Sequence, residues 1–460
     1  MNDVPADPFC QQGLAGFARD FRAGRVSAEE VTRAYLQRIE KLDGKFGAFE
    51  YVSAEQALST AKAMDLLLSS GTDLGPLMGV PVAVKDVFLM NGMPKPHVGS
   101  NMVLPEVIGS EEASFIKALR RAGCVIVGQT KAVELCLGIA GHSTPRGTPW
   151  NSTDPEQHRV PGGSSSGSGV AVATGMCAFA IGSDSGGSVR VPAALNGIFG
   201  LKTTAGFWPV DGAFPLDPRV DSIGLLTRSA QDASIAFDAI NAALFGQACE
   251  QASADTLKVN RLCFGLPTNH FTQGVNPLIA KAVERANQKL KDQGVLFEDI
   301  EVVQASERAQ YFPVSMPSSL LSIFGKDNFL AQKHLMDPVI AKRVESGLEA
   351  KAYEFLALED KRQASGKAVA KQMKGFDAWV SATTTDFAPL VNELDDPVKG
   401  MQLALGMTQN TQPANYLGLC AVSMPLPTDS LAIGYQLMGA PNDDRRLLDI
   451  AMRVEQVLCA

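Results

Sequence analysis

The stretch from Arg159 to Thr204 constrains this chain more than any other, because it joins two glycine- and serine-rich elements through an apolar run. The elements are Gly162-Gly163-Ser164 and Gly186-Gly187-Ser188. Each alone is typical of a turn or a flexible linker. A linker, however, would not be interrupted by Val170-Ala171-Val172 and followed by the apolar residues 189–195. We therefore interpret the whole stretch as a structured active site.

The apolar segment from Gly169 to Gly182 separates the two elements. It is too short to cross a membrane, since a spanning helix needs about 20 residues. We predict that it forms a buried helix. This helix would fix one serine loop relative to the other.

The order of motifs resembles the amidase signature hydrolases. The pattern GGSS-G-S is followed by D-x-GG-S-V-R-x-P and then by G-x-x-GLK, and Ser164 and Ser188 are 24 positions apart, as in that family. The segment 411–439 also resembles the closing strands of the family. Several independent motifs in one order are a specific signal, and the resemblance covers nearly the full chain.

Lys85 ends a run of branched apolar residues that is typical of a buried strand, Leu77 to Asp86. From this segment alone, a lysine that marks where the strand meets water is the simpler interpretation. The block G-V-P-x-x-V-K-D nevertheless resembles the one in which amidase signature enzymes carry their catalytic lysine. The resemblance therefore implies a catalytic role for Lys85.

Amide hydrolysis needs a nucleophile, a proton acceptor and donors for the oxyanion. The resemblance implies that Ser188 is the nucleophile, that Ser164 follows a cis peptide bond and relays a proton, and that Lys85 is the base. Lys85 must be neutral to accept a proton, and burial favours the neutral form. Because two glycines let successive N–H groups turn toward one point, we predict an oxyanion hole from the amides of Ser185, Gly186, Gly187 and Ser188.

Arg190 and Asp184 flank the predicted nucleophile. Buried charges need partners, so we expect these two residues to pair with each other and to serve the scaffold rather than the substrate.

The resemblance also implies the fold, an α/β architecture in which a mixed, largely parallel central sheet is covered by helices on both faces. No linker or repeat divides the chain, and we expect one amidase domain over residues 1–460 with a mainly helical variable region at about 305–375.

Local patterns predict individual elements. We expect helices after the capping box at 27–30, over 54–68 and 113–122, and beginning at Asn276-Pro277. We expect strands at 125–128, 262–265 and 295–302.

Composition favours small-molecule chemistry. The net charge of −8 argues against nucleic-acid and anionic-membrane partners. The same charge, with a shortage of motif-placed arginines near the two serine loops, predicts a preference for neutral substrates with an apolar acyl or aryl part over anionic ones. The eight cysteines include no C-x-x-C pair, and the five histidines include no H-E-x-x-H motif, so we expect no metal and no cofactor.

The N-terminus carries acids rather than a basic region before an apolar run, and we therefore expect a cytoplasmic enzyme. A homodimer is left open.

The resemblance implies cleavage of a linear amide, an aryl amide or a carbamate (urethane) bond through an acyl-enzyme. The alternative is the glutaminase subunit of a tRNA-dependent amidotransferase, which would need an arginine and an aspartate for the charged groups of glutamine. No such pair is evident in the sequence. Arg146 and Arg219 are candidates for binding a substrate carboxylate.

Overall fold

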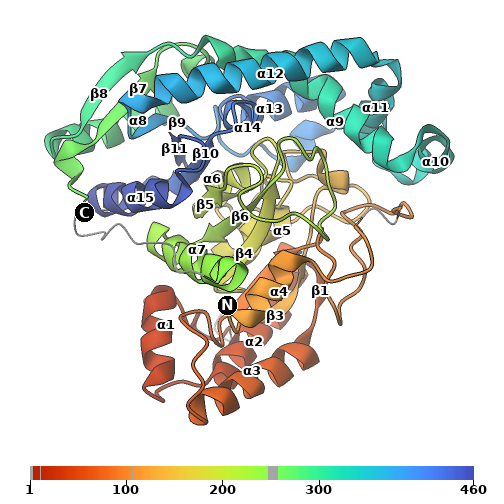
Figure 1. Ribbon diagram of the computed structural model, residues 1–460. Helices are drawn as coiled ribbons and strands as arrows, with labels where there is room; N and C mark the ends of the chain where they lie inside the picture. Colours follow the sequence, from red (N-terminus) through yellow and green to blue (C-terminus); the bar gives the residue numbers. More distant parts are fainter. Residues whose placement is uncertain (1–3, 11, 106–107, 247–256, 460) are drawn as a thin grey trace.

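The computed structural model describes residues 4–10, 12–105, 108–246 and 257–459. Its strands form one sheet of eleven strands with helices on both faces (Figure 1). In the order in which they lie side by side, the strands are β1 (Phe49–Val52), β3 (Val125–Thr130), β2 (Pro81–Lys85), β4 (Phe179–Asp184), β6 (Ser222–Thr227), β5 (Phe199–Lys202), β10 (Cys420–Pro425), β11 (Gly434–Gly439), β9 (Ala378–Ala382), β7 (Cys263–Pro267) and β8 (Leu296–Ile300).

Parallel and antiparallel pairs are mixed within this sheet. β2 is parallel to β3 and β4, and β7 is parallel to β8 and β9. The neighbouring strands in the middle of the sheet, in the spatial order β4, β6, β5, β10, β11 and β9, are all antiparallel to each other. β1 is also antiparallel to β3. The predicted mixed α/β sheet is confirmed. The sheet is not largely parallel, because antiparallel pairs predominate among the described strands. Antiparallel neighbours can be joined by short connections, whereas parallel neighbours require long crossovers.

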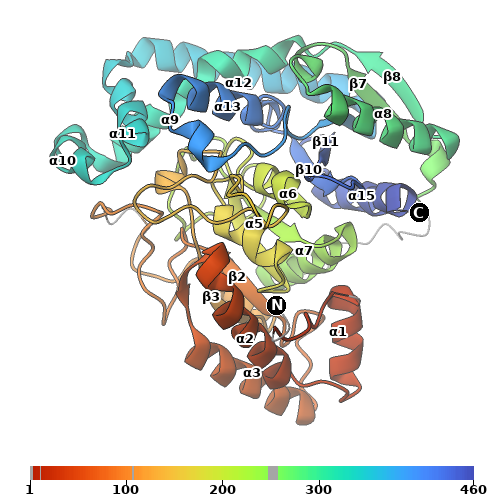
Figure 2. The same cartoon turned by 180° about the vertical axis from the view of Figure 1, so that it is seen from behind.

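The helices form layers on the two faces of the sheet. α4, α7 and α15 lie on one face and α5 and α6 on the other, as the opposite views in Figures 1 and 2 show. The helices in chain order are α1 (Gly13–Arg22), α2 (Ala28–Phe46), α3 (Ala54–Ser69), α4 (Ser114–Arg121), α5 (Ser166–Ala173), α6 (Arg190–Asn196), α7 (Ala230–Phe245), α8 (Pro277–Asp292), α9 (Arg308–Phe324), α10 (Lys326–Gln332), α11 (Pro338–Glu345), α12 (Ala352–Gln372), α13 (Pro397–Thr408), α14 (Gln412–Tyr416) and α15 (Asp444–Cys459).

The segment 169–182 corrects one prediction. It is not a single helix: α5 ends at Ala173, and β4 begins at Phe179. Gly175 lies between them with a φ of 66°, in the left-handed region that glycine adopts without steric cost. Because both elements are buried on all sides, neither shows the amphipathic periodicity that separates a helix from a strand.

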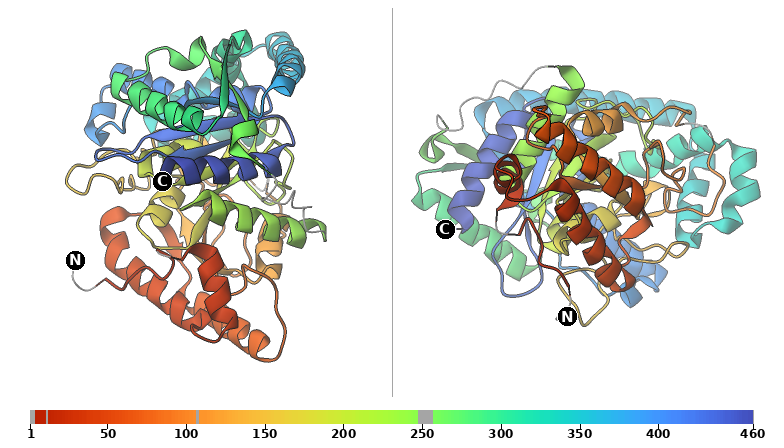
Figure 3. Two further views of the ribbon diagram at one scale, coloured as in Figure 1. Left: turned by 90° about the vertical axis from the view of Figure 1, so that its left-hand side faces the viewer. Right: turned by 90° about the horizontal axis from the view of Figure 1, so that it is seen from below.

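Helices α9 to α12 occupy most of residues 308–372, within the region that we expected to be mainly helical. Figures 1 and 3 show this region as an outer layer on the side of the molecule away from α1, α2 and α3, with α12 as its longest helix. Met316, Phe312 and Phe324 of α9 are buried in the main hydrophobic core. Within the described ranges, no helix is both long and apolar enough to cross a bilayer.

The cysteines are free thiols throughout the described ranges, and four of them are buried: Cys124, Cys136, Cys177 and Cys420. Cys249 lies outside the described residues.

The N-terminus of α2 has the capping box that the sequence predicts. The Ser27 side chain accepts a hydrogen bond from the Glu30 N–H at 3.0 Å, and the Glu30 carboxylate accepts one from the Ser27 N–H at 3.0 Å. Two of the N–H groups that lack a partner within the helix are thereby satisfied. The helix ends at Gly47, whose φ is 59°.

Replacing Ser27 by alanine is expected to lower the free energy of unfolding by about 1 kcal/mol, because the substitution removes the oxygen that caps α2. Chemical denaturation followed by circular dichroism measures this change. Ser69→Ala, at the exposed C-terminal end of α3, is the matched control and is expected to change stability by less than about 0.5 kcal/mol. Equal effects of the two substitutions would contradict the capping role.

Candidate active site

Two adjacent parallel strands bring the predicted catalytic groups together. β2 and β4 pair in register, with Val84 opposite Ile181, so their carboxyl ends lie side by side. Lys85 is the last residue of β2, and the turn that carries Ser188 follows β4 directly. In α/β sheets, ligands commonly bind outside the carboxyl ends of such strands.

Lys85 is completely buried and contacts two serines. Its Nζ donates to Ser164 Oγ at 2.8 Å and to Ser183 Oγ at 2.9 Å. No carboxylate forms an ion pair with Lys85 in the part of the chain that the structure describes. Ser183 was not predicted from the sequence. Its position one residue before the Asp184 of the motif was the only available signal.

The loop before α5 places Ser164. The Gly163–Ser164 peptide bond is cis, as the resemblance implies. Three backbone hydrogen bonds attach the loop to the segment 133–140: Gly162 N to Ala140 O at 2.9 Å, Gly163 N to Ile139 O at 2.6 Å, and Val133 N to Ser164 O at 3.0 Å. The Ser165 N–H donates to the Ser188 carbonyl at 3.2 Å, so the two serine loops are also joined to each other.

A buried ion pair shapes the turn that carries Ser188. The Asp184 carboxylate accepts from both Arg190 Nε and Nη2, at 3.1 and 3.0 Å, and from the N–H groups of Gly187 and Val189. Burial raises the pKa of Asp184, but the Arg190 guanidinium outweighs this effect and holds that pKa well below its usual value. The carboxylate therefore stays ionised, and the pair forms part of the scaffold as expected.

One of the four amides that the sequence predicts for the oxyanion hole makes a hydrogen bond within the protein. The Gly187 N–H donates to Asp184 Oδ1 at 2.7 Å, so this amide is directed into the scaffold and is not available to a substrate. The amides of Ser185, Gly186 and Ser188 make no hydrogen bond within the described residues. We retain these three as the proposed donors.

Ser185 is held by a second buried carboxylate. Its Oγ donates to Asp221, which also accepts from the N–H groups of Leu216 and Asp217. Burial raises the pKa of Asp221 to about 6. Asp221 thus holds the turn through the side chain of Ser185.

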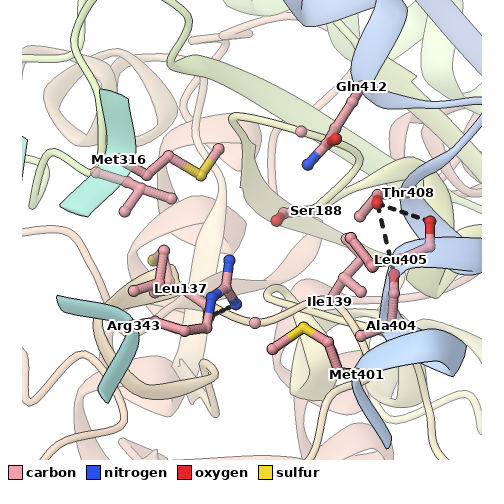
Figure 4. A pocket seen from close by; sticks show the side chains of 14 residues that line it. Leu137, Ile139, Ser188, Met316, Arg343, Met401, Ala404, Leu405, Thr408 and Gln412 are labelled. Carbon is pink, nitrogen blue, oxygen red and sulfur yellow. Dashed lines mark hydrogen bonds between the residues drawn. The ribbon is translucent and has the colours of Figure 1, made fainter. Parts of the chain in front are cut away.

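Ser188 lies in the wall of a cavity of roughly 500 Å³, its open mouth included. Figure 4 shows apolar side chains around it, with Arg343 and Gln412 as its larger polar groups. The lining residues come from the segment 136–139, the turn at 186–188, Leu216 and helices α9, α11, α13 and α14: Cys136, Leu137, Gly138, Ile139, Gly186, Ser188, Leu216, Met316, Arg343, Met401, Ala404, Leu405, Thr408 and Gln412.

Arg343 brings a positive charge to this cavity. It is half-buried on α11 and donates to the Leu137 carbonyl at 2.6 Å. Burial lowers its pKa to about 10, so the guanidinium is protonated at neutral pH. Among the described residues, no carboxylate lines the cavity or pairs with Arg343. The expected preference for neutral substrates overlooked this residue, because α11 belongs to the region in which the sequence contains no motif.

The two arginines that the sequence suggested as carboxylate ligands do not line the cavity. Arg146 pairs with Glu50 at 3.1 Å, and Arg219 pairs with Asp217 at 2.8 Å. Their charges are thus neutralised by the protein itself. No group of three or more potential metal-ligating side chains is assembled within the described ranges.

Known proteins share both the sequence and this architecture. The chain is 33% identical over 448 residues to 2-amino-5-chloromuconic acid deaminase of Comamonas testosteroni, covering 97% of this chain and 96% of that protein. It is 32% identical to a subunit of the glutamyl-tRNA(Gln) amidotransferase of Symbiobacterium thermophilum, with 95% of each chain covered. A crystal structure of an amidase superposes with a TM-score of 0.87 at 26% identity, covering 97% of this chain and 100% of that one.

The comparison with protein families agrees with the motifs and with the fold. The amidase family model matches residues 30–448, a range that contains Lys85, Ser164 and Ser188. This protein is therefore a member of the amidase signature family and a hydrolase that acts on carbon–nitrogen bonds.

Proposed function

We propose that this chain hydrolyses the amide bond of a small, carboxylate-bearing molecule through an acyl-enzyme on Ser188. The observation that carries the proposal is the buried hydrogen bond from Lys85 to Ser164, on the loop that is joined to Ser188. A free serine hydroxyl is too weakly acidic to attack an amide unaided. The buried lysine and serine supply a route for its proton.

In the proposed reaction, the Ser188 proton moves to Ser164 while the Ser164 proton moves to neutral Lys85. The Ser188 Oγ–carbon bond forms, and the carbonyl electron pair moves to oxygen, facing the amides of Ser185, Gly186 and Ser188. Collapse of this intermediate breaks the carbon–nitrogen bond, and the leaving nitrogen takes the proton back from Lys85 through Ser164. Water then hydrolyses the ester by the same route, which releases the acid and restores Ser188.

The environment of Lys85 supports its role as the base. Its side chain is completely buried, and no carboxylate of the described residues pairs with it. Ser164 and Ser183 hold the nitrogen in place in either protonation state, since a hydroxyl both donates and accepts.

Arg343 supports a substrate with a carboxylate. An uncompensated guanidinium in an apolar cavity attracts an anionic group and binds a carboxylate in two-point geometry. The relative named as a deaminase of 2-amino-5-chloromuconic acid carries a carboxylic acid in the name of its substrate. Aryl amides and carbamates without such a group are expected to be weaker substrates.

The glutaminase alternative has less support from the cavity. Glutamine carries an α-ammonium group as well as a carboxylate, and an ammonium binds best beside an acid. The described residues that line the cavity include no aspartate and no glutamate. The relatives named as amidotransferase subunits nevertheless make glutamine a necessary member of any substrate panel.

Ser188→Ala is expected to abolish hydrolysis, because it removes the atom that becomes acylated. The loss should exceed about a thousandfold, and a fluorophosphonate should label the wild type at Ser188 only, as judged by mass spectrometry. Ser166→Ala is the control and should stay active, because Ser166 is a buried serine at the first position of α5 that donates to the Lys131 carbonyl. Labelling at Ser164 instead would reverse the two serine roles.

Lys85→Ala and Lys85→Arg are both expected to lose most of the activity between about pH 6 and 10. A guanidinium keeps the positive charge but stays protonated, so it does not act as a base. Steady-state kcat/KM for both variants and the wild type measures this. Substantial activity of the arginine variant would indicate a purely electrostatic role and would refute the relay.

Arg343→Met is expected to raise KM for a carboxylate-bearing amide by about 10- to 100-fold, because a hydrogen-bonded ion pair with the substrate is lost. The monoamide of a four-carbon dicarboxylic acid and the matching neutral diamide are the substrate pair, with glutamine as a third substrate. The diamide should be unaffected by the substitution, and the exposed neighbour Lys342→Met should behave as the wild type. A wild-type enzyme that prefers the diamide or glutamine would contradict the proposed substrate class.

A further inference from the structure

Arg308, the first residue of α9, is a second arginine close to the cavity, and it is buried. Its Nη1 donates to Gln412 Oε1 at 2.5 Å and to Thr408 Oγ1 at 3.3 Å, and both of these residues line the cavity. No carboxylate pairs with it among the residues that the structure describes. Burial lowers its pKa to about 10, so Arg308 is a cation at neutral pH. Arg308 does not itself line the cavity, but it contacts Gln412 and Thr408, which do.

The contact with Arg308 fixes the orientation of the Gln412 amide. A guanidinium only donates hydrogen bonds, so the amide oxygen must face Arg308 and the NH₂ group must face the other way. Figure 4 shows the Gln412 nitrogen directed toward Ser188. A Cβ atom built on Gly186 would lie 3.5 Å from this nitrogen. The NH₂ group therefore lies beside the turn that carries the nucleophile.

Gln412 has no other hydrogen-bond partner within the described residues, so its NH₂ group is free to contact a bound molecule. The turn at 185–188 has fewer free N–H donors than the sequence suggested, because the Gly187 N–H is hydrogen-bonded to Asp184. The NH₂ group of Gln412 is a further donor beside Gly186.

We propose that Gln412 is a catalytic residue that donates a hydrogen bond from Nε2 to the substrate carbonyl oxygen as negative charge develops there, and that Arg308 is its positioning residue. The assignment rests on the proposed acyl-enzyme function. Arg308 polarises the Gln412 amide through their hydrogen bond, which strengthens the donor on the far side. The oxyanion is thus stabilised by a buried cation that does not touch it.

Four variants test the assignment: Gln412→Met, Gln412→Glu, Arg308→Met and the double variant Arg308→Met/Gln412→Met. The first readout is the rate at which a fluorophosphonate labels Ser188, because its phosphoryl oxygen takes the place of the carbonyl oxygen and no amide substrate is needed. The second is kcat and KM for the best amide of the panel. Thermal unfolding of each variant reports on folding.

Each single variant is expected to slow labelling and kcat by about tenfold or more, within the range seen when one oxyanion donor is lost, while KM stays unchanged. The double variant should be no slower than Gln412→Met, because Arg308 acts through Gln412. Gln412→Glu should be slower than Gln412→Met, since it keeps an acceptor for Arg308 but directs an anion at the oxyanion. Gln409→Met, a nearby glutamine that donates to the His270 and Gln273 carbonyls, should leave labelling unchanged.

Three results would overturn the assignment. These are a labelling rate of Gln412→Met within twofold of the wild type, additive losses in the double variant, and a loss confined to KM for carboxylate-bearing amides. The proposed function fails separately, when Ser188 of the wild type is labelled but no amide in the panel is hydrolysed. In that case the labelling rates still decide the role of Gln412.

Discussion

The ion pair between Asp184 and Arg190 is the interaction on which the geometry of the site depends. Burying two charges is costly, and removing one partner of such a pair typically destabilises a protein by about 3–5 kcal/mol. Here the cost is offset because the charged groups have several further hydrogen-bond partners: the N–H groups of Gly187 and Val189, the Thr411 carbonyl, and the side chains of Asn415 and Gln436. Through these contacts one arginine positions both the Ser188 turn and the chain on either side of Gln412.

The sequence locates the candidate reacting groups because their predicted roles are tied to local motifs. Lys85, Ser164 and Ser188 each lie in a glycine- or valine-rich block whose spacing is specific, and the structure brings Lys85 and Ser164 within hydrogen-bonding distance. The cavity wall is different. Arg343 comes from a helix without such a block and Gln412 from α14, and both line the cavity beside Ser188, which lies 155 and 224 positions earlier in the sequence.

The fold was predicted least well where elements are buried on every side. The run at 169–182 is uniformly apolar, so its division into α5 and β4 leaves no periodic signal. The resemblance implied a largely parallel sheet, but β5, β6, β10 and β11 pair antiparallel in its middle. Which strands become neighbours depends on long-range pairing, and local sequence patterns do not encode it. By contrast, capping residues such as Ser27 and Asn276 marked the start of α2 and α8 correctly, because a cap acts within one helical turn.

The candidate reacting groups and the rest of the cavity wall come from different parts of the fold, and this separation affects how the substrate range of such a protein can change. Lys85 and Ser188 are placed by the ends of two adjacent strands, and Ser164 by the loop before α5, whereas much of the cavity wall belongs to α9, α11, α13 and α14. Substitutions at the cavity positions of α11 and α13 are therefore expected to alter which molecule fits without disturbing the proposed proton route. Exchange of α11 and α13 between homologues, with Arg308 of α9 and Gln412 of α14 kept, is a practical way to graft a new substrate range onto the same reacting groups.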